Sequence, residues 1–323
     1  NCYLNNIYEK ALRALRSQLN EIHRVDHSLK YWRILIGPWL WYFLQVIFDR
    51  WTMLKQAIER NAISGCSIIK KDENTFIPNS MNDCIKIFVE DNWNEMIYGQ
   101  LLQTYIKDKI NIIQVEKDNW KPQISHQNNK TFIYFIRQLK TLAFGMVKNL
   151  NNWSQNQDEH FFIKTYLPTL IEKKLLKRLG QNLKYWKLAT IPQTEVSNIK
   201  RKWTIDIQLP FDEYSNIINS MVSKHIPIVY LEGYKSLLAC SKNLGWPKRP
   251  KSIFTSIEYF SNDIFKAWAA EKIDNGVPLV IGQHGGHVGS ALWASHHDHQ
   301  INIADKWLSW GWSEEKKTNI IPV

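Results

Sequence analysis

Apolar residues recur at helical spacing through the first sixty positions of the chain. Leu12, Leu15, Leu19 and Ile22 lie three or four residues apart, which places their side chains on one face of a helix. The pattern predicts two or three helices between about residue 3 and about residue 60.

The longest apolar run, residues 34–48, has 15 positions that are interrupted only by Gln45. A helix that spans a bilayer needs roughly 20 such residues. We expect Gly37-Pro38 to break the run early, because proline has no N–H and its ring clashes with the preceding turn. The run therefore predicts a buried helix, and Ser28 is expected to cap it before Tyr31.

Two more helical patterns, at residues 91–106 and 131–150, lie on either side of a polar stretch at 111–129 that contains a candidate strand. Residues 162–186 predict an amphipathic pair of helices. The basic residues in this segment and directly after it are Lys164, Lys173, Lys174, Lys177, Arg178, Lys184 and Lys187. Such a face could lie on an anionic membrane, or it could simply be a solvated helix surface.

The hydrophobic period changes after Pro227, where short apolar runs alternate with helical stretches as in βαβ units. We predict strands at 228–231, 252–256, 277–281 and 307–310, and helices at 236–243 and 263–273. The fold class is therefore α/β, with a helix-rich N-terminal part and a doubly wound Rossmann-like parallel sheet. Ligands of such sheets bind at the carboxyl ends of the strands, so the loops after Leu231, Thr255 and Ile281 are the first places to search.

The charge is concentrated in the first part of the chain. The 323 residues include 41 Lys and Arg and 30 Asp and Glu, a net charge of +11. Residues 1–200 hold 28 basic and 18 acidic groups (28 − 18 = +10), whereas residues 201–323 hold 13 and 12 (13 − 12 = +1). Positive charge attracts phosphates, whether of nucleic acid, anionic lipid or a phosphorylated substrate. No basic stripe interleaved with aromatics is present, so we expect no nucleic-acid partner.

The four cysteines, Cys2, Cys66, Cys84 and Cys240, form no CxxC pair. This spacing argues against a disulfide framework and against a cysteine zinc site, and it favours a reducing cytoplasmic location.

Half of the ten histidines lie within sixteen residues, at His284, His287, His296, His297 and His299. Composition alone would place about half of one histidine in such a window. This cluster is the strongest indication of chemistry in the sequence.

The cluster begins in a glycine-rich loop, residues 282–289, that follows a predicted strand. Glycines let backbone N–H groups approach a ligand closely, which suits a phosphate or an anionic transition state. The loop matches neither the dinucleotide-binding nor the P-loop fingerprint. His284 could act in it as a general base or as a phosphate contact, since imidazole titrates near neutral pH.

Other readings of these residues stay open. His287, His296, His297, Asp298 and His299 could be metal ligands, although their spacing matches no standard signature. Glu232 could be an acid or base at a strand end, or it could cap the following helix. The aromatics after Asp305 are expected to form core or wall.

Several stretches of the chain resemble the LIC12162-type transferases of bacterial surface-carbohydrate gene clusters. The two most specific are Gln-His-Gly-Gly-His-Val-Gly at 283–289 and Ala-Asp-Lys-Trp-Leu-Ser-Trp-Gly-Trp at 304–312. The other matching segments are 19–23, 28–33, 37–40, 49–50, 230–234, 250–256 and 265–268. The resemblance extends from about Leu19 to Trp312.

The resemblance implies a glycosyltransferase-like enzyme of the two-Rossmann (GT-B) architecture, which transfers a sugar from a nucleotide-activated donor to a cell-surface glycan without a metal or another cofactor. It also implies three parts. Residues 1–225 would be a mostly helical region within the N-terminal Rossmann-like domain, 226–312 the βαβ sheet with the His/Gly loop, and 313–323 the start of a linker to a second half that this chain does not contain.

Under this reading the expected catalytic residues are His284, Glu232 and His299. The expected substrate-binding residues are Gln283, Gly285, Gly286, Gly289, His287, Asp305, His23 and Arg33, and no metal ligands are expected. The expected partners are a nucleotide sugar and a glycan or lipid-linked acceptor, with a possible peripheral contact to an anionic membrane at its inner face. The alternatives are a metal-dependent hydrolase that uses the His284–His299 cluster and a non-catalytic membrane-surface module of a glycan assembly complex.

Overall fold

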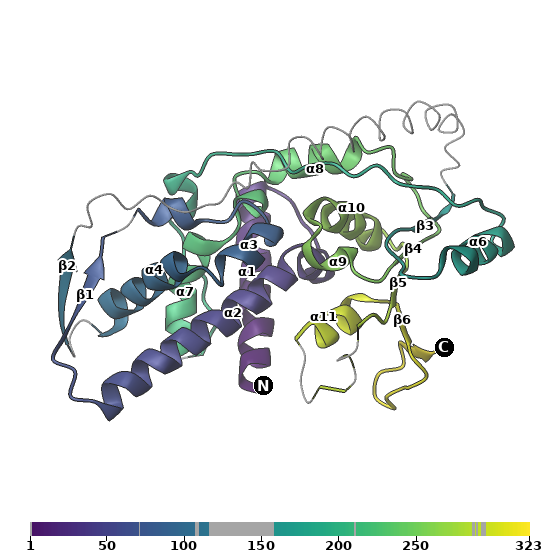
Figure 1. Ribbon diagram of the computed structural model, residues 1–323. Helices are drawn as coiled ribbons and strands as arrows, with labels where there is room; N and C mark the ends of the chain where they lie inside the picture. The colour runs from purple at the N-terminus through teal and green to yellow at the C-terminus, as the bar shows by residue number, and fades with distance from the viewer. Residues whose placement is uncertain are drawn as a thin grey trace, which may run out of the picture.

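The structure is a computed structural model, and it describes residues 2–70, 72–106, 110–115, 158–209, 211–285, 288, 290–291 and 295–323. Helices gather around the long helix α2 in the first part of the chain, and a parallel five-stranded sheet forms the other end of the molecule (Figure 1). The predicted α/β class, with a helix-rich N-terminal part and a parallel sheet, is confirmed.

Two helices form the centre of the helical part, α1 (Cys2–His23) and α2 (Leu29–Arg60). The predicted cap is confirmed, because the Ser28 hydroxyl accepts a hydrogen bond from the Tyr31 N–H at 3.1 Å. The expected break at Gly37-Pro38 is wrong: α2 continues through Pro38 without interruption. A proline inside a helix costs about 3 kcal/mol. Every residue from position 34 to 41 is buried, and this packing outweighs the lost hydrogen bond.

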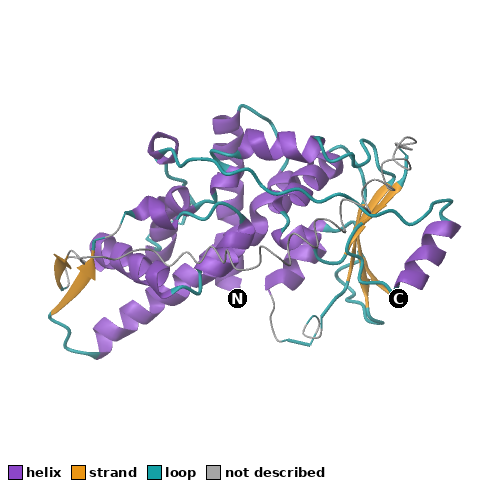
Figure 2. Ribbon diagram, turned by 45° about the horizontal axis from the view of Figure 1, so that its top comes forward, coloured by secondary structure: helices purple, strands orange, loops and turns teal. Residues whose placement is uncertain are grey.

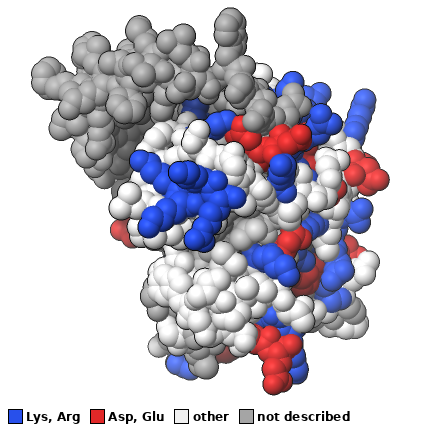
Figure 3. Space-filling view, turned by 90° about the vertical axis from the view of Figure 1, so that its right-hand side faces the viewer, with Lys and Arg blue, Asp and Glu red and all other residues white. Residues whose placement is uncertain are grey.

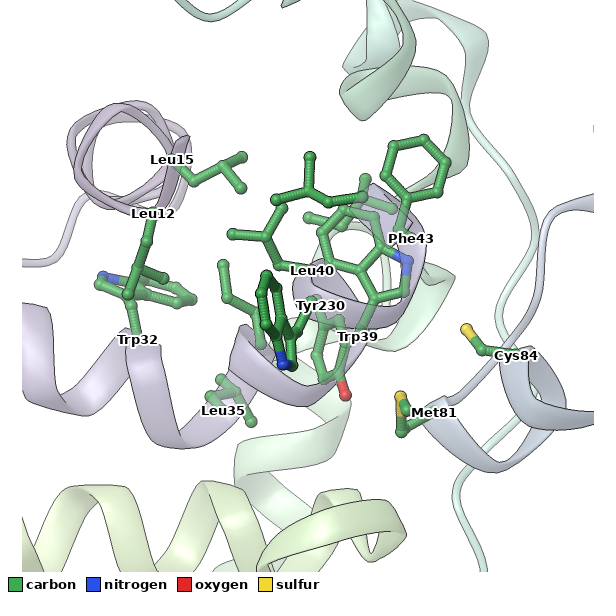
Figure 4. Packing of buried hydrophobic residues seen from close by; sticks show 14 of the residues in the cluster. Leu12, Leu15, Trp32, Leu35, Trp39, Leu40, Phe43, Met81, Cys84 and Tyr230 are labelled. Carbon is green, nitrogen blue, oxygen red and sulfur yellow. The ribbon is translucent and has the colours of Figure 1, made fainter. Parts of the chain in front are cut away.

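The core around α2 is made of large apolar side chains from several helices (Figure 4). Trp39 and Phe43 stack with their ring centroids 5.5 Å apart. Leu12 and Leu15 of α1 point toward this cluster, and Met81 and Cys84 approach it from α3. The apolar run read from the sequence is thus a buried helix, as predicted. Among the described residues, no helix is long and apolar enough to cross a membrane.

The rest of the helical part contains β1 (Gly65–Ile69), the 3₁₀ turn η1 (Glu73–Phe76), α3 (Met81–Ile87), α4 (Asp91–Leu101), the π-helical turn η2 (Leu102–Ile106) and β2 (Asn111–Val115). Of these elements, β1, η1 and α3 were not predicted, and the others lie in predicted segments. The predicted helix at 91–106 is present as α4 and η2, and the candidate strand within 111–129 is present as β2, which pairs in parallel with β1. The helix predicted at 131–150 lies outside the described residues.

The main sheet has the order β3-β4-β5-β6-β7, and all neighbouring strands are parallel. The strands are β3 (His160–Phe162), β4 (Ser252–Thr255), β5 (Leu279–Gly282), β6 (Lys306–Ser309) and β7 (Ile320–Pro322). Three of the predicted strands therefore exist as β4, β5 and β6. The strands β3 and β7 were not anticipated, because each has only three residues and neither lies in a long apolar run.

Helices cover both faces of this sheet (Figure 2). On one face, Trp268 of α10 (Asp263–Asp274) packs against Phe161 of β3, and α11 (Ser295–Ile303) contacts β5 and β6, which it connects. The helices α8 (Tyr234–Lys242) and α9 (Glu258–Ser261) pack against α10. The other face packs against α6 (Thr169–Arg178), where Leu176 joins Phe162 and Phe254 in a small separate core. Neighbouring residues in a strand point to opposite faces, so each buried strand contributes side chains to the packing on both faces of the sheet.

Two further predictions about local structure are wrong. Residues 162–186 are not a pair of helices, because the segment begins at the end of β3 and contains only α6. Residues 228–231 are not a strand but the 3₁₀ turn η5 (Ile228–Tyr230). The N–H groups of Ile228 and Val229 donate to the carbonyls of Pro78 and Asn79, both at 3.0 Å, so they cannot pair with the sheet.

The remaining elements, η4 (Asn198–Arg201) and α7 (Glu213–His225), lie between α6 and η5 along the chain. A buried polar cluster joins this region to α10. The Lys266 ammonium lies 2.8 Å from an Asp263 carboxylate oxygen and donates to the Tyr230 hydroxyl at 2.8 Å, and all three side chains are fully buried. Asp263 also accepts a hydrogen bond from the Met81 N–H at 2.9 Å, which ties α3 to α10.

Candidate functional site

The carboxyl ends of the parallel strands surround a pocket of about 350 Å³. Its wall is formed by residues that end strands or directly follow them, among them Thr165, Tyr166, Ser256, His284, Leu308 and Trp310. This is the edge of an open α/β sheet at which ligands bind. Of the residues singled out from the sequence, Gln283, His284 and Gly285 line this pocket.

Gln283 holds the strand ends together. Its backbone N–H donates to the carbonyl of Leu308 at 2.8 Å. Its side-chain oxygen accepts hydrogen bonds from the Trp310 N–H at 2.8 Å and the Trp312 indole at 2.9 Å, and its amide group donates to the Val288 carbonyl at 3.1 Å. Both ends of the buried amide are thus engaged by protein, and Gln283 ties β5 and β6 to the glycine-rich loop.

His284 follows Gln283 and lies at the wall of the pocket, half-buried. Its ring centroid is 5.6 Å from that of Tyr166, whose side chain is 64% exposed. Gly285, the next residue, has a φ of +79°, which side-chain-bearing residues rarely adopt. The glycine lets the backbone turn immediately after His284.

The floor of the pocket is closely packed at Gly282, the last residue of β5. A Cβ atom at this position would lie 2.9 Å from the Ser256 hydroxyl oxygen and 3.2 Å from the Phe254 ring. The Ser256 hydroxyl donates to the Thr165 carbonyl at 2.8 Å, which joins the ends of β3 and β4. Glycine is therefore required at 282 because the neighbouring strand ends approach its backbone closely.

The loop after β3 contributes residues that sequence reasoning missed. Lys164 and Tyr166 adopt positive φ angles of 47° and 57°, a conformation that is costly for residues with side chains and that concentrates at functional sites. The Thr165 hydroxyl between them donates to the Glu172 carboxylate at 3.1 Å. No signal pointed to Tyr166, because β3 is too short to be recognised from its hydrophobic pattern.

His299 lies in a second pocket, of about 280 Å³, between α1, α2 and α11. It is buried there, next to Gly37, where a Cβ atom would come within 2.8 Å of the imidazole. Arg33 lies nearby and donates two hydrogen bonds, of 2.5 and 2.7 Å, to the Glu9 carboxylate, which also lines this pocket. The pKa of Glu9 is lowered, chiefly by these hydrogen bonds from Arg33, so that the pair is ionised.

Glu232 and His23 lie together at a different place, the turn between η5 and α8. The Glu232 carboxylate accepts two hydrogen bonds from Arg201, of 2.7 and 2.6 Å, and one from the Ser197 N–H at 3.1 Å. Only 2% of its side chain is exposed. His23 lies 3.0 Å from the Tyr230 carbonyl through Nε2, and burial lowers its pKa to about 4. The structure thus places both residues in protein contacts away from the pocket at the strand ends.

Asp305 lies at the amino ends of the strands, on the opposite side of the sheet from His284 at the carboxyl ends. One of its carboxylate oxygens accepts a hydrogen bond from the N–H of Leu279, the first residue of β5, at 2.7 Å. The other lies 2.8 Å from the Lys30 ammonium. Asp305 therefore joins the amino ends of two strands to α2.

Gly286, His287 and Gly289 lie outside the described residues, and so does the side chain of His296. His297 packs between Trp307 and Trp312, and burial lowers its pKa. Within the described part of the chain, no three His, Cys, Asp or Glu side chains are grouped so that they could hold a metal ion.

A parallel α/β sheet with a pocket at the carboxyl ends of its strands is the arrangement in which open α/β proteins bind their ligands. The model of the LIC12162 family transferases matches residues 2–323, nearly the whole chain. The chain belongs to this family and is a transferase. No curated protein and no solved structure matches it.

Proposed function

We propose that this transferase moves a sugar from a nucleotide-activated donor to a glycan or lipid-linked acceptor of the cell surface, at the pocket that His284 lines. The observation that carries the proposal is the position of His284, a titratable group at the end of a parallel strand, followed by a backbone turn at Gly285. The reaction would take place in the cytoplasm, at the inner face of the membrane.

The chemistry requires one bond to form and one to break. An acceptor hydroxyl oxygen attacks the anomeric carbon of the donor, the bond from that carbon to the phosphate oxygen breaks, and the nucleoside diphosphate leaves. The hydroxyl proton is taken up by the His284 imidazole, which suits this role near neutral pH. In the alternative role, His284 donates a hydrogen bond to the departing phosphate, and N–H groups of the glycine-rich loop stabilise its charge. No metal is required in either case.

Gln283 and Ser256 support this site as positioning residues. Gln283 holds the segment that carries His284 against β6, and Ser256 fixes the loop after β3 on the other side of the pocket. Neither side chain is free to take part in chemistry, since each is already engaged in hydrogen bonds within the protein.

The first experiment measures the thermal stability of the chain with a panel of UDP-, GDP-, CDP- and TDP-sugars, with and without a chelator. A donor present at a hundred times its Kd stabilises the folded state by about 2.7 kcal/mol, which raises the midpoint measurably. We expect one nucleotide class to stabilise the protein and the effect to survive chelation. Chelator-induced loss of stability without any nucleotide effect would overturn the proposal and favour the metal-dependent hydrolase.

The variant His284→Gln separates the two roles of His284. Loss of a general base lowers turnover roughly 10²- to 10⁴-fold while donor binding is kept. Loss of a phosphate contact weakens donor binding instead. His160→Gln is the matched control, because His160 lies at the opposite end of the same sheet, where its Nδ1 is 2.7 Å from the Ser252 hydroxyl. Equal donor binding and turnover in the wild type and in both variants would exclude His284 from the site.

A further inference from the structure

Helix α6 presents a strongly basic face. Its ten residues include four cations, Lys173, Lys174, Lys177 and Arg178, and one acidic residue, Glu172. The four cations are exposed, and they form no ion pair within the part of the chain that the structure describes. Lys and Arg side chains gather on the face of the molecule that carries α6 (Figure 3). Elsewhere in the molecule, cations such as Lys55, Lys184 and Arg201 are paired with carboxylates.

The inner side of α6 fixes the helix to the sheet. Leu176 is buried against Phe162 and Phe254, which are the third residues of β3 and β4 and lie opposite each other in the sheet. Glu172, the only acidic residue, accepts a hydrogen bond from Thr165 in the loop after β3. The basic face is therefore held in a fixed orientation relative to the sheet and its pocket.

Apolar side chains stand among these cations. Leu170 is 72% exposed and precedes Lys174 by four residues and Lys177 by seven, so it lies on the same side of the helix as both. Ile171 is 48% exposed, and Tyr166, just before the helix, is 64% exposed. Leaving large apolar side chains in water is unfavourable, and their position between cations is unusual for a face that only solvates the protein.

We propose that α6 docks this protein on the surface of a lipid bilayer that contains anionic headgroups. Each lysine or arginine close to such a surface is attracted by the negative surface potential, while exposed apolar side chains enter the boundary between headgroups and acyl chains. A dissolved polyanion would satisfy the cations but would leave Leu170 and Ile171 in water. The combination of cations and apolar side chains therefore favours a bilayer over a nucleic acid.

Docking would bring the pocket to the membrane. Thr165, Tyr166 and Leu167, which lead directly into α6, line the pocket that contains His284. A bilayer bound at α6 would therefore lie beside the pocket, within reach of an acceptor that is anchored in lipid. This orientation rests on the proposed function, whereas the docking itself does not.

The test is sedimentation of the full chain with vesicles, without any sugar nucleotide. Vesicles of phosphatidylcholine alone are compared with vesicles of phosphatidylcholine and phosphatidylglycerol at salt concentrations from about 0.1 M to about 0.5 M. We expect binding only to the anionic vesicles, and weaker binding at the higher salt concentration because the charges are screened.

Two variants and a matched control test whether α6 is the docking element. Each lysine near an anionic surface contributes about fivefold to binding, so Lys174→Gln/Lys177→Gln should bind roughly 25-fold more weakly. The control, Lys86→Gln/Lys242→Gln, removes the same charge from exposed positions on α3 and α8 and should bind like the wild type. Leu170→Ser should weaken the binding that remains at high salt, and it leaves the core intact because Leu170 is exposed.

The proposal is overturned if the wild type does not sediment with anionic vesicles, or if both double variants lose binding equally. It is also overturned if Leu170→Ser has no effect and an oligonucleotide competes fully with the vesicles, since α6 would then be a general polyanion site. Failure of donor binding in the thermal-shift experiment leaves vesicle binding unaffected, so the two proposals fail separately.

Discussion

The ion pair between Glu232 and Arg201 is predicted to stabilise the fold, and replacing Glu232 with Gln tests this. The guanidinium donates two hydrogen bonds to the carboxylate, and the exposed fractions of the two side chains are 2% for Glu232 and 5% for Arg201. Arg201 also donates to the carbonyls of Ser223 and Ile226, at 3.0 and 2.8 Å. The pair therefore ties η4 and the end of α7 to the turn before α8.

Glutamine keeps the shape of the side chain and removes its charge, which leaves the Arg201 charge buried without a counter-charge. Breaking a buried ion pair in this way costs about 3 to 5 kcal/mol. Because Arg201 keeps its two carbonyl partners, we expect a loss near the lower end, about 3 kcal/mol. That is a large fraction of the roughly 5 to 15 kcal/mol by which folded proteins are stable.

Urea unfolding followed by circular dichroism measures this loss as a lower midpoint at an unchanged slope. Glu213→Gln is the control, because Glu213 pairs with Lys55 at 2.9 Å while both side chains remain 60% and 41% exposed. Breaking such a surface pair costs at most about 1 kcal/mol. If Glu232→Gln were as stable as Glu213→Gln, the structural reasoning would be refuted, and Glu232 would again be a candidate for acid–base chemistry.

Three further predictions concern stability. Burial lowers the pKa of His225 to about 3, so the unfolded chain, with a pKa near 6.5, binds the proton first as the pH falls. The neutral, buried His225 therefore stabilises the fold fully above pH 6.5, and the free energy of unfolding falls by about 1.4 kcal/mol per pH unit as the pH falls toward 3. A His225→Gln variant whose stability fell with pH as steeply as that of the wild type would contradict this. Gly37→Ala should destabilise the protein by about 1 to 3 kcal/mol, because the new Cβ atom would lie 2.8 Å from the His299 and Tyr8 side chains. Gly99→Ala should stabilise α4 by up to about 1 kcal/mol, because the nearest atom to its Cβ would be 3.9 Å away and alanine favours the helix. Equal midpoints for these two alanine variants in thermal unfolding would disprove the packing argument. Ser28→Ala should cost about 1 kcal/mol in urea unfolding through loss of the cap on α2, and an unchanged midpoint would mean that another group caps this helix.

The predicted site residues lie in separate regions of the structure, and the sequence could not show which of them are close together. His284 lies at the pocket, and His299 lies in a second pocket beside Arg33 and Glu9. Glu232 lies in the turn between η5 and α8, and His23, at the end of α1, contacts the carbonyl of Tyr230 in η5. His299 was selected as a member of the histidine cluster, and the others were selected because a titratable residue stood next to a predicted strand or an apolar segment. Proximity along the chain says where an element ends, but not which other elements meet there.

The sequence alone determined the long elements and the glycine-rich loop. Helices α2, α4, α8 and α10 and the strands β4 to β6 follow from hydrophobic spacing, because that spacing reports which side of an element is buried. The loop that begins at Gly282 could also be predicted from the sequence. The neighbouring strand ends approach Gly282 so closely that the position requires glycine, and the glycines are visible in the sequence.

Tertiary structure decided the rest. Pro38 stays helical because the packing around it outweighs a missing hydrogen bond, and Ile228 and Val229 form a turn because their N–H groups are taken by the loop before α3. The strand β3 exists only because β4 pairs with it, and it brings Tyr166 to the pocket. Glu232 is a partner of Arg201 because the chain folds residues 31 positions apart into contact. These features depend on contacts between segments that are far apart in the sequence. Such contacts produce no repeating hydrophobic pattern from which they could be predicted.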